Sequence, residues 1–413
     1  MDERRWLFLL PVLVCLAGLW HVHIIDRGMP QSHSDLMPRW VGIRAAFRGE
    51  DPYTPGVLRD IQTAYYGRPL TPADERRVDP QGFFYPAYTA IVLGPLALLP
   101  WNVARLAFLA VAPPLLVAGL WLCIRALKSA SHLAWIATAF TLASWPAIWG
   151  LRQQQPTLLT AAFVFLAYFL IVRDNDIPAG ALLAASTIKP QLVAPLILWL
   201  FLWSVLQRRY KLLVSFTCAM TALLIPTEIL IPHWFPHWIH SLTSYQAVGN
   251  NALPLVFVMG SVPGLLATVV LVSVSVYVLW RLRFADVQSL HFGVAFSLVL
   301  AAALCVTPIK LAIIYNQMLL VPAAVLLFCW KPVGYHANVA RCLAIGLFVW
   351  GSLAVPLAVI AENILGPSDF WDALSFHNIL LPVVSTVALL VQYWDVLQAT
   401  PSAQPDEFAT AMV

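Results

Sequence analysis

Apolar segments of membrane-spanning length recur along almost the whole chain, and no other feature constrains its fold as strongly. A helix needs about 20 mainly apolar residues to cross the hydrocarbon core of a bilayer. Only 11% of the 413 residues are charged, against about 25% in a soluble domain. The fold class predicted is therefore all-α, a polytopic membrane protein of about 12 transmembrane helices that forms one integral membrane domain over residues 1–400, followed by a disordered tail at 401–413. The twelve helices are expected near 6–25, 104–124, 132–150, 156–172, 177–190, 191–206, 211–231, 262–280, 287–306, 314–330, 341–361 and 377–394.

The basic residues predict how these helices are oriented. Arg4 and Arg5 precede the first helix, which we expect to stay uncleaved with its start in the cytoplasm. Alternate crossings then place ten basic residues in cytoplasmic loops between helices: Arg125, Lys128, Arg173, Arg208, Arg209, Lys211, Arg281, Arg283, Lys331 and Arg341. The short outer loops hold three, Arg152, Lys189 and Lys310. This asymmetry agrees with the positive-inside rule, and long loops such as 26–103 translocate largely regardless of charge.

The segment "FFYPAYTAIVLGPLALLP" (83–100) resembles a short membrane helix. Its apolar core of about 14 residues is short for a span. A full crossing here would also invert the orientation of every later helix. We therefore predict an interfacial or re-entrant helix that ends at Pro100, within a long first extracytoplasmic loop (26–103) that contains interfacial helices.

The three basic residues of the short outer loops are candidate phosphate ligands. Ionisable groups at membrane depth usually face a cavity and mark a substrate path, and Lys and Arg suit a phosphate. The alternative is that each side chain extends to the interface without a function. Polar neighbours in these loops and in loop 244–252 are candidate substrate contacts: Gln154, Gln155, Gln191, Tyr315, Asn316 and Asn250.

Asp35 lies a few residues beyond the end of the first apolar segment, in "QSHSDLMPRW". A carboxylate at the mouth of the membrane region can reach a lipid headgroup and act as a base on a hydroxyl. The alternative is an ordinary solvated loop carboxylate.

Three histidines, His233, His237 and His240, follow helical spacing in "PHWFPHWIH" and could bind a metal ion. Their interleaving with Trp234 and Trp238 is more typical of an aromatic belt at the membrane interface. We expect no metal site and no cofactor.

The order of several blocks resembles glycosyltransferase family 87, the membrane family of polyprenyl-phosphate-mannose-dependent α-mannosyltransferases with the GT-C fold. The blocks are "SDLMPRWVGIRAAFRGEDPYTP", "FFYPAYTAIVLGPLALLP", "QQQPTLL" and "STIKPQLVAPLILWL" followed by "QRRYK", and they cover about residues 34–215. The chain departs from the family pattern at Tyr85-Pro86-Ala87, where the family often has Y-P-P. It also has "RQQQP" in place of G-Q-x-N, so Gln154 or Gln155 is expected to take the role of that glutamine.

The resemblance implies an inverting, metal-independent transfer of a sugar, with mannose expected, from a polyprenyl-phosphate donor to a hydroxyl of a glycan or glycolipid acceptor. Asp35 matches the family's catalytic base, and Lys189 is the leading donor-phosphate ligand, followed by Arg152 and Lys310. His33 and Tyr85 join the candidate substrate contacts. The resemblance also implies a multi-pass protein of the bacterial inner (plasma) membrane, with its active site on the extracytoplasmic side.

Two other functions remain open from the sequence. A transporter or flippase of a lipid-linked saccharide would also need a wet basic cavity, but such proteins often have paired halves, and none are evident. A polymerase or ligase of lipid-linked glycans is expected to have its large outer loop later in the chain, whereas here the large outer loop (26–103) comes first. The net charge of +4 does not indicate nucleic-acid binding. The partners that the family resemblance implies are the lipid-linked sugar, the acceptor and the bilayer.

Overall fold

The computed structural model describes residues 34–71, 73–74, 78–127, 131–247, 252–308, 314–329, 335–365 and 370–398. Within these ranges the chain is helical and contains no strand, which confirms the all-α prediction. The predicted first helix at 6–25 and the predicted tail at 401–413 lie outside the described residues.

Most of the described helices follow one another with short connections, and the longest connection between them runs from Tyr66 to Thr89. The first long segment contains α2 (Leu36–Phe47), α3 (Pro55–Tyr66), α4 (Thr89–Val92) and α5 (Gly94–Ala97). It leads into α6 (Trp101–Ala126), α7 (Ser131–Ala143), α8 (Trp145–Arg152), α9 (Thr157–Val172), α10 (Asp176–Ser186), α11 (Pro190–Leu206) and α12 (Tyr210–Leu230). The remainder comprises α13 (Trp234–Ala247), α14 (Pro254–Met259), α15 (Ser261–Arg281), η3 (Leu282–Phe284), α16 (Leu290–Cys305), η4 (Ile314–Leu320), α17 (Val321–Cys329), α18 (Tyr335–Leu365) and α19 (Phe370–Gln398).

Three helices of the described chain are long and apolar enough to cross a membrane, judged by length and composition. They are Trp101–Ala126, Tyr210–Leu230 and Ser261–Phe284. Five shorter apolar helices accompany them: Thr157–Val172, Pro190–Leu206, Leu290–Cys305, Ile314–Phe328 and Ile379–Gln392. The helices are those of a membrane protein, and the count of twelve spans stays a prediction.

Two predicted helices are divided, and both divisions lie at a proline. The segment 132–150 breaks at Ser144, whose backbone is extended, and α8 begins anew with Pro146 in its first turn. The segment 314–330 begins as the 3-10 helix η4 and becomes α-helical only at Val321, just before Pro322. Proline lacks an N–H donor and clashes with the preceding turn, so it is favoured where a helix starts.

The segment 83–100 does not form the single interfacial or re-entrant helix that we predicted. It contains two one-turn helices, α4 and α5, which meet at Leu93. Pro86 begins the turn that leads into α4, since its carbonyl accepts from the Thr89 N–H at 2.9 Å, and Pro95 occupies the first turn of α5. The prolines and the adjoining Gly94 divide the apolar run into short pieces.

The helices around α9 form the core, where small residues allow close approach. A side chain added at Gly119 of α6 would place its Cβ 2.9 Å from the Ala162 carbonyl of α9. A Cβ at Gly180 of α10 would lie 2.7 Å from the Leu212 carbonyl of α12. Helices in membranes commonly pack through such small residues, and both contacts are tight enough to exclude any larger side chain.

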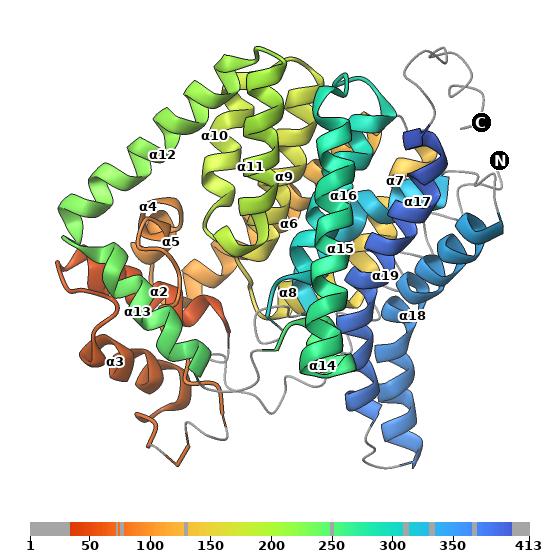
Figure 1. The fold of residues 1–413 in the computed structure, drawn as a ribbon. Coiled ribbons are helices and arrows are strands. Elements are labelled where there is room, and N and C mark those ends of the chain that lie inside the picture. Colours follow the sequence, from red (N-terminus) through yellow and green to blue (C-terminus); the bar gives the residue numbers. More distant parts are fainter. Residues whose placement is uncertain are drawn as a thin grey trace, which may run out of the picture.

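Helix α12 packs against α10 near its start and then diverges toward the group formed by α2, α3 and α13 (Figure 1). The short helices α4 and α5 lie between them, while α18 and α19 run together along the opposite flank (Figure 1). The loops after α9 and α11 lie at the end of the bundle remote from α2, α3 and α13. The first long segment therefore covers one end of the bundle.

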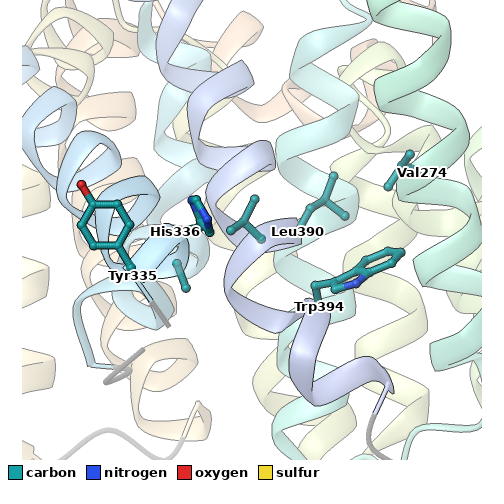
Figure 2. Close-up of a pocket in the computed structure, with 7 residues that line it drawn as sticks. Val274, Tyr335, His336, Leu390 and Trp394 are labelled. Atoms are coloured by element: carbon teal, nitrogen blue, oxygen red, sulfur yellow. The ribbon is translucent and has the colours of Figure 1, made fainter. Parts of the chain in front are cut away.

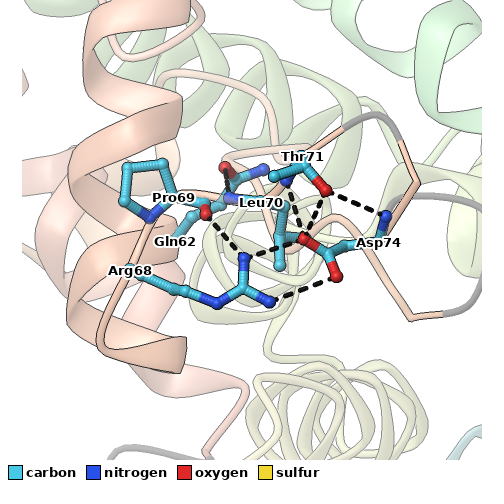
Figure 3. Close-up of polar contacts among 6 residues, drawn as sticks. All are labelled: Gln62, Arg68, Pro69, Leu70, Thr71 and Asp74. Atoms are coloured by element: carbon cyan, nitrogen blue, oxygen red, sulfur yellow. Dashed lines mark hydrogen bonds and ion pairs between the residues drawn. The ribbon is translucent and has the colours of Figure 1, made fainter.

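The loop after α3 is braced by its own side chains (Figure 3). Arg68 pairs with Asp74 at 2.7 Å, and Asp74 also accepts from the Thr71 backbone N–H at 2.9 Å. Gln62 accepts from the Leu70 N–H at 2.9 Å and donates to the Pro80 carbonyl at 3.0 Å. These bonds tie the end of α3 to Leu70 and to Pro80.

Candidate active site

The start of α2 is tied to the turn between α8 and α9. The Asp35 backbone N–H donates to the Gln153 carbonyl at 3.0 Å. The Ser34 hydroxyl donates to Gln154 Oε1 at 2.7 Å. These bonds hold Asp35 beside a turn that lies far away in the sequence.

The α8–α9 turn is tight because of its backbone conformation. Gln154 has a φ of 51°, which is uncommon for a residue other than glycine. The Gln155 N–H donates back to the Gly150 carbonyl at 2.9 Å, and Pro156 precedes the first turn of α9. Both Gln154 and Gln155 are 1% exposed, so the turn places two amide side chains inside the protein.

Gln155 links the predicted base to the predicted phosphate ligand. Its Nε2 donates to Asp35 Oδ2, and its Oε1 accepts from Lys189 Nζ at 3.0 Å. Lys189 Nζ also donates to Thr157 Oγ1 at 2.6 Å, and the Thr157 hydroxyl donates to Asn316 Oδ1 at 2.9 Å. These five residues form a continuous hydrogen-bonded chain, which we call the Asp35–Lys189 network.

Lys189 occupies a buried position between two aromatic rings. It immediately precedes Pro190, the first residue of α11, and is 6% exposed. Its Nζ lies 4.7 Å from the ring centroid of Tyr315 and 5.7 Å from that of Tyr85. Ring faces attract a cation at such distances, so the ammonium is held by aromatic as well as polar partners.

Arg39 is a second cation at the site, one helical turn after Asp35. Its Nη1 donates to the Asp35 carbonyl at 2.7 Å, and its guanidinium carbon lies 4.3 Å from the Tyr85 ring centroid. Its Nε is buried and finds no acceptor among the described residues. A buried donor without a partner is rare, and a bound anion would satisfy it.

The charges at the site are unbalanced. Burial raises the pKa of Asp35, while the positive charges of Arg39 and Lys189 oppose that rise. Burial and the charge of Arg39 hold the pKa of Lys189 well below its usual value, against the attraction of Asp35. Two cations around one carboxylate favour a further negative charge, and an anion bound there would raise the pKa of Lys189 again.

The structure brings six of the predicted site residues together. Asp35, Gln155, Lys189 and Asn316 belong to the network, and the rings of Tyr85 and Tyr315 cover its lysine. Gln154 lies beside the network, because its Oε1 accepts from the hydroxyl of Ser34, the residue before Asp35.

The other predicted site residues are not placed in this network. Arg152 ends α8, and its guanidinium carbon lies 4.6 Å from the ring centroid of Trp149. Gln191 is exposed in the first turn of α11. Their roles stay predictions. His33, Asn250 and Lys310 lie outside the described residues.

Sequence reasoning missed Arg39 and Thr157. Arg39 is one of many basic residues in the long first loop, where charge carries no topological information, so no charge count could select it. Its spacing of four from Asp35 on a helix was the available signal. Thr157 lies in "QQQPTLL", where only the glutamines were predicted to contact the substrate.

The histidine segment has a different environment from the metal site that we considered. His237 Nδ1 lies 2.7 Å from Asp51 Oδ2. Within the described ranges, no group of three His, Cys, Asp or Glu residues is arranged to hold a metal ion. Metal independence stays a prediction, because it concerns the reaction.

A cavity of about 410 Å³ lies elsewhere, between α15, α18 and α19. Val274, His336, Leu390 and Trp394 line it (Figure 2), together with Tyr335, Ala337 and Val391. None of these residues belongs to the Asp35–Lys189 network.

These features define the class of the protein as a helical membrane protein with a buried, charged site assembled by five separate segments. The family model of glycosyltransferase family 87 matches residues 83–308, and the chain belongs to this family. It is therefore a membrane glycosyltransferase, as the sequence resemblance predicted. Lys189 and Gln155 lie inside the matched range, whereas Asp35 precedes it. No curated protein and no solved structure matches the chain.

Proposed function

We propose that this glycosyltransferase moves a sugar, with mannose expected, from a polyprenyl-phosphate donor to an acceptor hydroxyl, with inversion and without a metal ion. The observation that carries the proposal is the Gln155 amide, which holds the Asp35 carboxylate at one end and the Lys189 ammonium at the other. A base and a cation held in fixed positions suit the displacement of a phosphate by a hydroxyl. The sequence resemblance supplies the donor class and the GT-C type of fold.

Asp35 acts as the base in this reaction. The acceptor oxygen forms a bond to the anomeric carbon while the bond from that carbon to the donor phosphate oxygen breaks. The electron pair leaves on the phosphate, and the acceptor proton moves to a carboxylate oxygen of Asp35. Burial raises the pKa of Asp35, so its carboxylate is a stronger base than an exposed one.

Lys189 and Arg39 receive the leaving group. The donor phosphodiester carries one negative charge, and the departing polyprenyl phosphate gains another as the bond breaks. Cations that are already oriented in a buried site stabilise such developing charge without reorganisation. Lys189 is held by Gln155 and Thr157, and Arg39 by the Asp35 carbonyl and Tyr85.

A single displacement accounts for inversion. The Asp35–Lys189 network contains one carboxylate, and a phosphate leaving group needs no general acid. A retaining mechanism would require a nucleophile on the opposite face of the sugar in addition to the base.

The helix directions support an extracytoplasmic site. Helices α9 and α11 both begin at the network and end near the basic loops that hold Arg173 and Arg208. The positive-inside rule assigns such loops to the cytoplasm. The site is then on the extracytoplasmic side, which in a bacterium is the outer face of the inner membrane.

The test uses the full-length protein in liposomes with radiolabelled polyprenyl-phosphate mannose and a series of glycoside acceptors. We expect a labelled glycoside whose new linkage has the anomeric configuration opposite to that of the donor. Retention of configuration would exclude the single displacement. Failure of the wild-type protein to consume the donor, while a polyprenyl-phosphate glucose donor is consumed, would exclude mannose.

A further inference from the structure

A second carboxylate, Asp79, lies near the proposed base but outside the Asp35–Lys189 network. Asp79 is exposed. Its Oδ1 accepts from the Gln81 backbone N–H at 3.0 Å, and its Oδ2 accepts from the Tyr245 hydroxyl at 2.9 Å. Since a carboxylate offers about four acceptor sites, Asp79 can accept further hydrogen bonds from a ligand.

Aromatic side chains contact Asp79 and one another. Phe84 and Tyr245 stack with their ring centroids 4.0 Å apart, and Tyr65 and Tyr66 meet edge-on at 4.8 Å. The Tyr66 hydroxyl donates to the Asp79 carbonyl at 2.6 Å. We call these residues, Asp79, Phe84, Tyr65, Tyr66 and Tyr245, the Asp79 cluster.

The cluster is fixed by contacts on both sides. On one side Gln62, drawn in Figure 3, donates from its Nε2 to the carbonyl of Pro80, the residue after Asp79, at 3.0 Å. Helix α13 holds it from the other side, because Trp238 Nε1 donates to the Phe84 carbonyl at 3.1 Å and Tyr245 donates to Asp79. A site held in this way needs little rearrangement to bind a ligand.

The negative charge of Asp79 reaches the proposed base. It is one of the charges that raise the pKa of Asp35, after the larger effect of burial. The same charge acts on Tyr65, Tyr66 and Tyr245, whose pKa values burial chiefly raises. Geometry connects the two sites: Phe84 of the cluster is followed in the chain by Tyr85, whose ring centroid lies 4.3 Å from the guanidinium carbon of Arg39. The cluster therefore adjoins the site that holds Asp35.

We propose that the Asp79 cluster binds the acceptor as an uncharged sugar, with Asp79 accepting a hydrogen bond from a hydroxyl adjacent to the one that reacts. Sugars present apolar C–H faces that stack on aromatic rings and hydroxyls that donate to carboxylates. The inference rests on the proposed function, and it names which residues select the acceptor.

The distribution of charge separates the two substrates. Lys189 and Arg39 offer positive charge for a phosphate, whereas Asp35 and Asp79 offer negative charge on the acceptor side. An acceptor with a phosphate or carboxylate beside the reacting hydroxyl would be repelled by both carboxylates. Asp79 therefore favours a neutral acceptor over an anionic one of the same shape.

The experiment compares two acceptors, octyl α-D-mannoside and its 6-phosphate, with radiolabelled polyprenyl-phosphate mannose as donor and the full-length protein in liposomes. The variants are Asp79→Asn and Tyr245→Phe, which removes the hydroxyl but keeps the ring stacked on Phe84. Asp60→Asn is the matched control, because Asp60 is an exposed carboxylate on α3 of the same segment. KM and kcat are measured for each acceptor, with donor hydrolysis as a separate readout.

We expect wild-type protein to prefer the neutral mannoside. Asp79→Asn should raise the KM for it by roughly 10- to 100-fold, the loss typical of one hydrogen bond to a charged group, and should weaken the preference over the phosphate. Tyr245→Phe should raise the KM for the neutral mannoside less. Asp60→Asn should change neither this KM nor the preference for the neutral acceptor. If Asp79→Asn does not fold, the acceptor KM of Tyr245→Phe tests the inference: an increase supports acceptor binding by the cluster, and an unchanged value contradicts it.

Other results would overturn the inference. An unchanged acceptor KM and an unchanged preference would remove the cluster from acceptor binding, and a fall in kcat alone would make Asp79 part of the chemical step. Donor hydrolysis without transfer to the neutral mannoside would contradict the inference but leave the donor chemistry standing. Absence of both transfer and hydrolysis would contradict the proposed function itself.

Discussion

The side-chain amide of Gln155 donates to the carboxylate of Asp35, although the two residues are 120 positions apart. The same amide accepts from the buried Lys189 ammonium. The proposed base and the proposed phosphate ligand are therefore positioned by one side chain.

Asp35→Asn should reduce transfer by at least about 10²-fold, the lower range for loss of a general base. The amide keeps the shape of the side chain but cannot take the acceptor proton. The measurement is kcat in liposomes, together with donor binding, which should change little. The Asp60→Asn variant serves as the control, and near-normal turnover of Asp35→Asn would remove this residue from the mechanism.

Lys189→Met should raise the KM for the lipid-phosphate donor more than the KM for the acceptor. The variant keeps an unbranched apolar stem between Tyr85 and Tyr315 but lacks the charge that faces the phosphate. Steady-state titration of each substrate measures the two effects. Lys211→Met, on an exposed lysine of α12, is the control, and equal losses for both substrates in Lys189→Met would argue against a phosphate contact.

Two variants should shift the acid limb of the pH–rate profile in opposite directions. Arg39 lowers the pKa of Asp35, so Arg39→Gln should raise that pKa and move the loss of activity to higher pH. Asp79 raises the pKa of Asp35, so Asp79→Asn should move the limb to lower pH. Because the active base is the deprotonated form, activity falls as the pH drops through its pKa. If both variants moved the acid limb of the kcat profile in the same direction, Asp35 would not be the group that sets this limb.

Removal of divalent metal ions should leave the rate unchanged. In the proposed mechanism, Lys189 and Arg39 supply the positive charge that a metal ion would otherwise provide. The measurement is transfer after dialysis against EDTA, with added Mg²⁺ or Mn²⁺ as the comparison. Loss of activity that a metal restores would require a metal site in the mechanism.

Gly180→Val should destabilise the protein by about 1–3 kcal/mol, the usual range for overpacking. A Cβ at this position would lie 2.7 Å from both the Leu212 carbonyl and the Phe216 N–H of α12. Thermal unfolding in detergent measures the effect. Gly346→Val is the matched control, since nothing lies within 4 Å of the corresponding Cβ, and equal stability of the two variants would contradict the close crossing of α10 and α12.

Much of the helical framework could be predicted from the sequence. The apolar segments at 104–124, 156–172 and 211–231 correspond closely to α6, α9 and α12, because hydropathy is a property of consecutive residues. The breaks in 83–100 and 132–150 were less visible, although each contains a proline. There, local backbone chemistry prevails over the average hydropathy of the segment.

The candidate site was predictable only in part. Asp35 and Lys189 were selected by their position relative to apolar segments, and the polar loops indicated Gln155 and Asn316. The sequence did not reveal Arg39, Thr157 or Asp79, since each resembles many other polar residues of its segment.

What the sequence by itself determined is the chemistry available: a helical membrane protein of glycosyltransferase family 87 with isolated charges at the ends of apolar helices. Only the tertiary structure decided which of those charges meet. Hydropathy acts along the chain and specifies which segments are buried in the membrane. The meeting of Asp35, Gln155 and Lys189 depends on how α2, α9 and α11 pack, and that packing depends on contacts between residues far apart in the sequence.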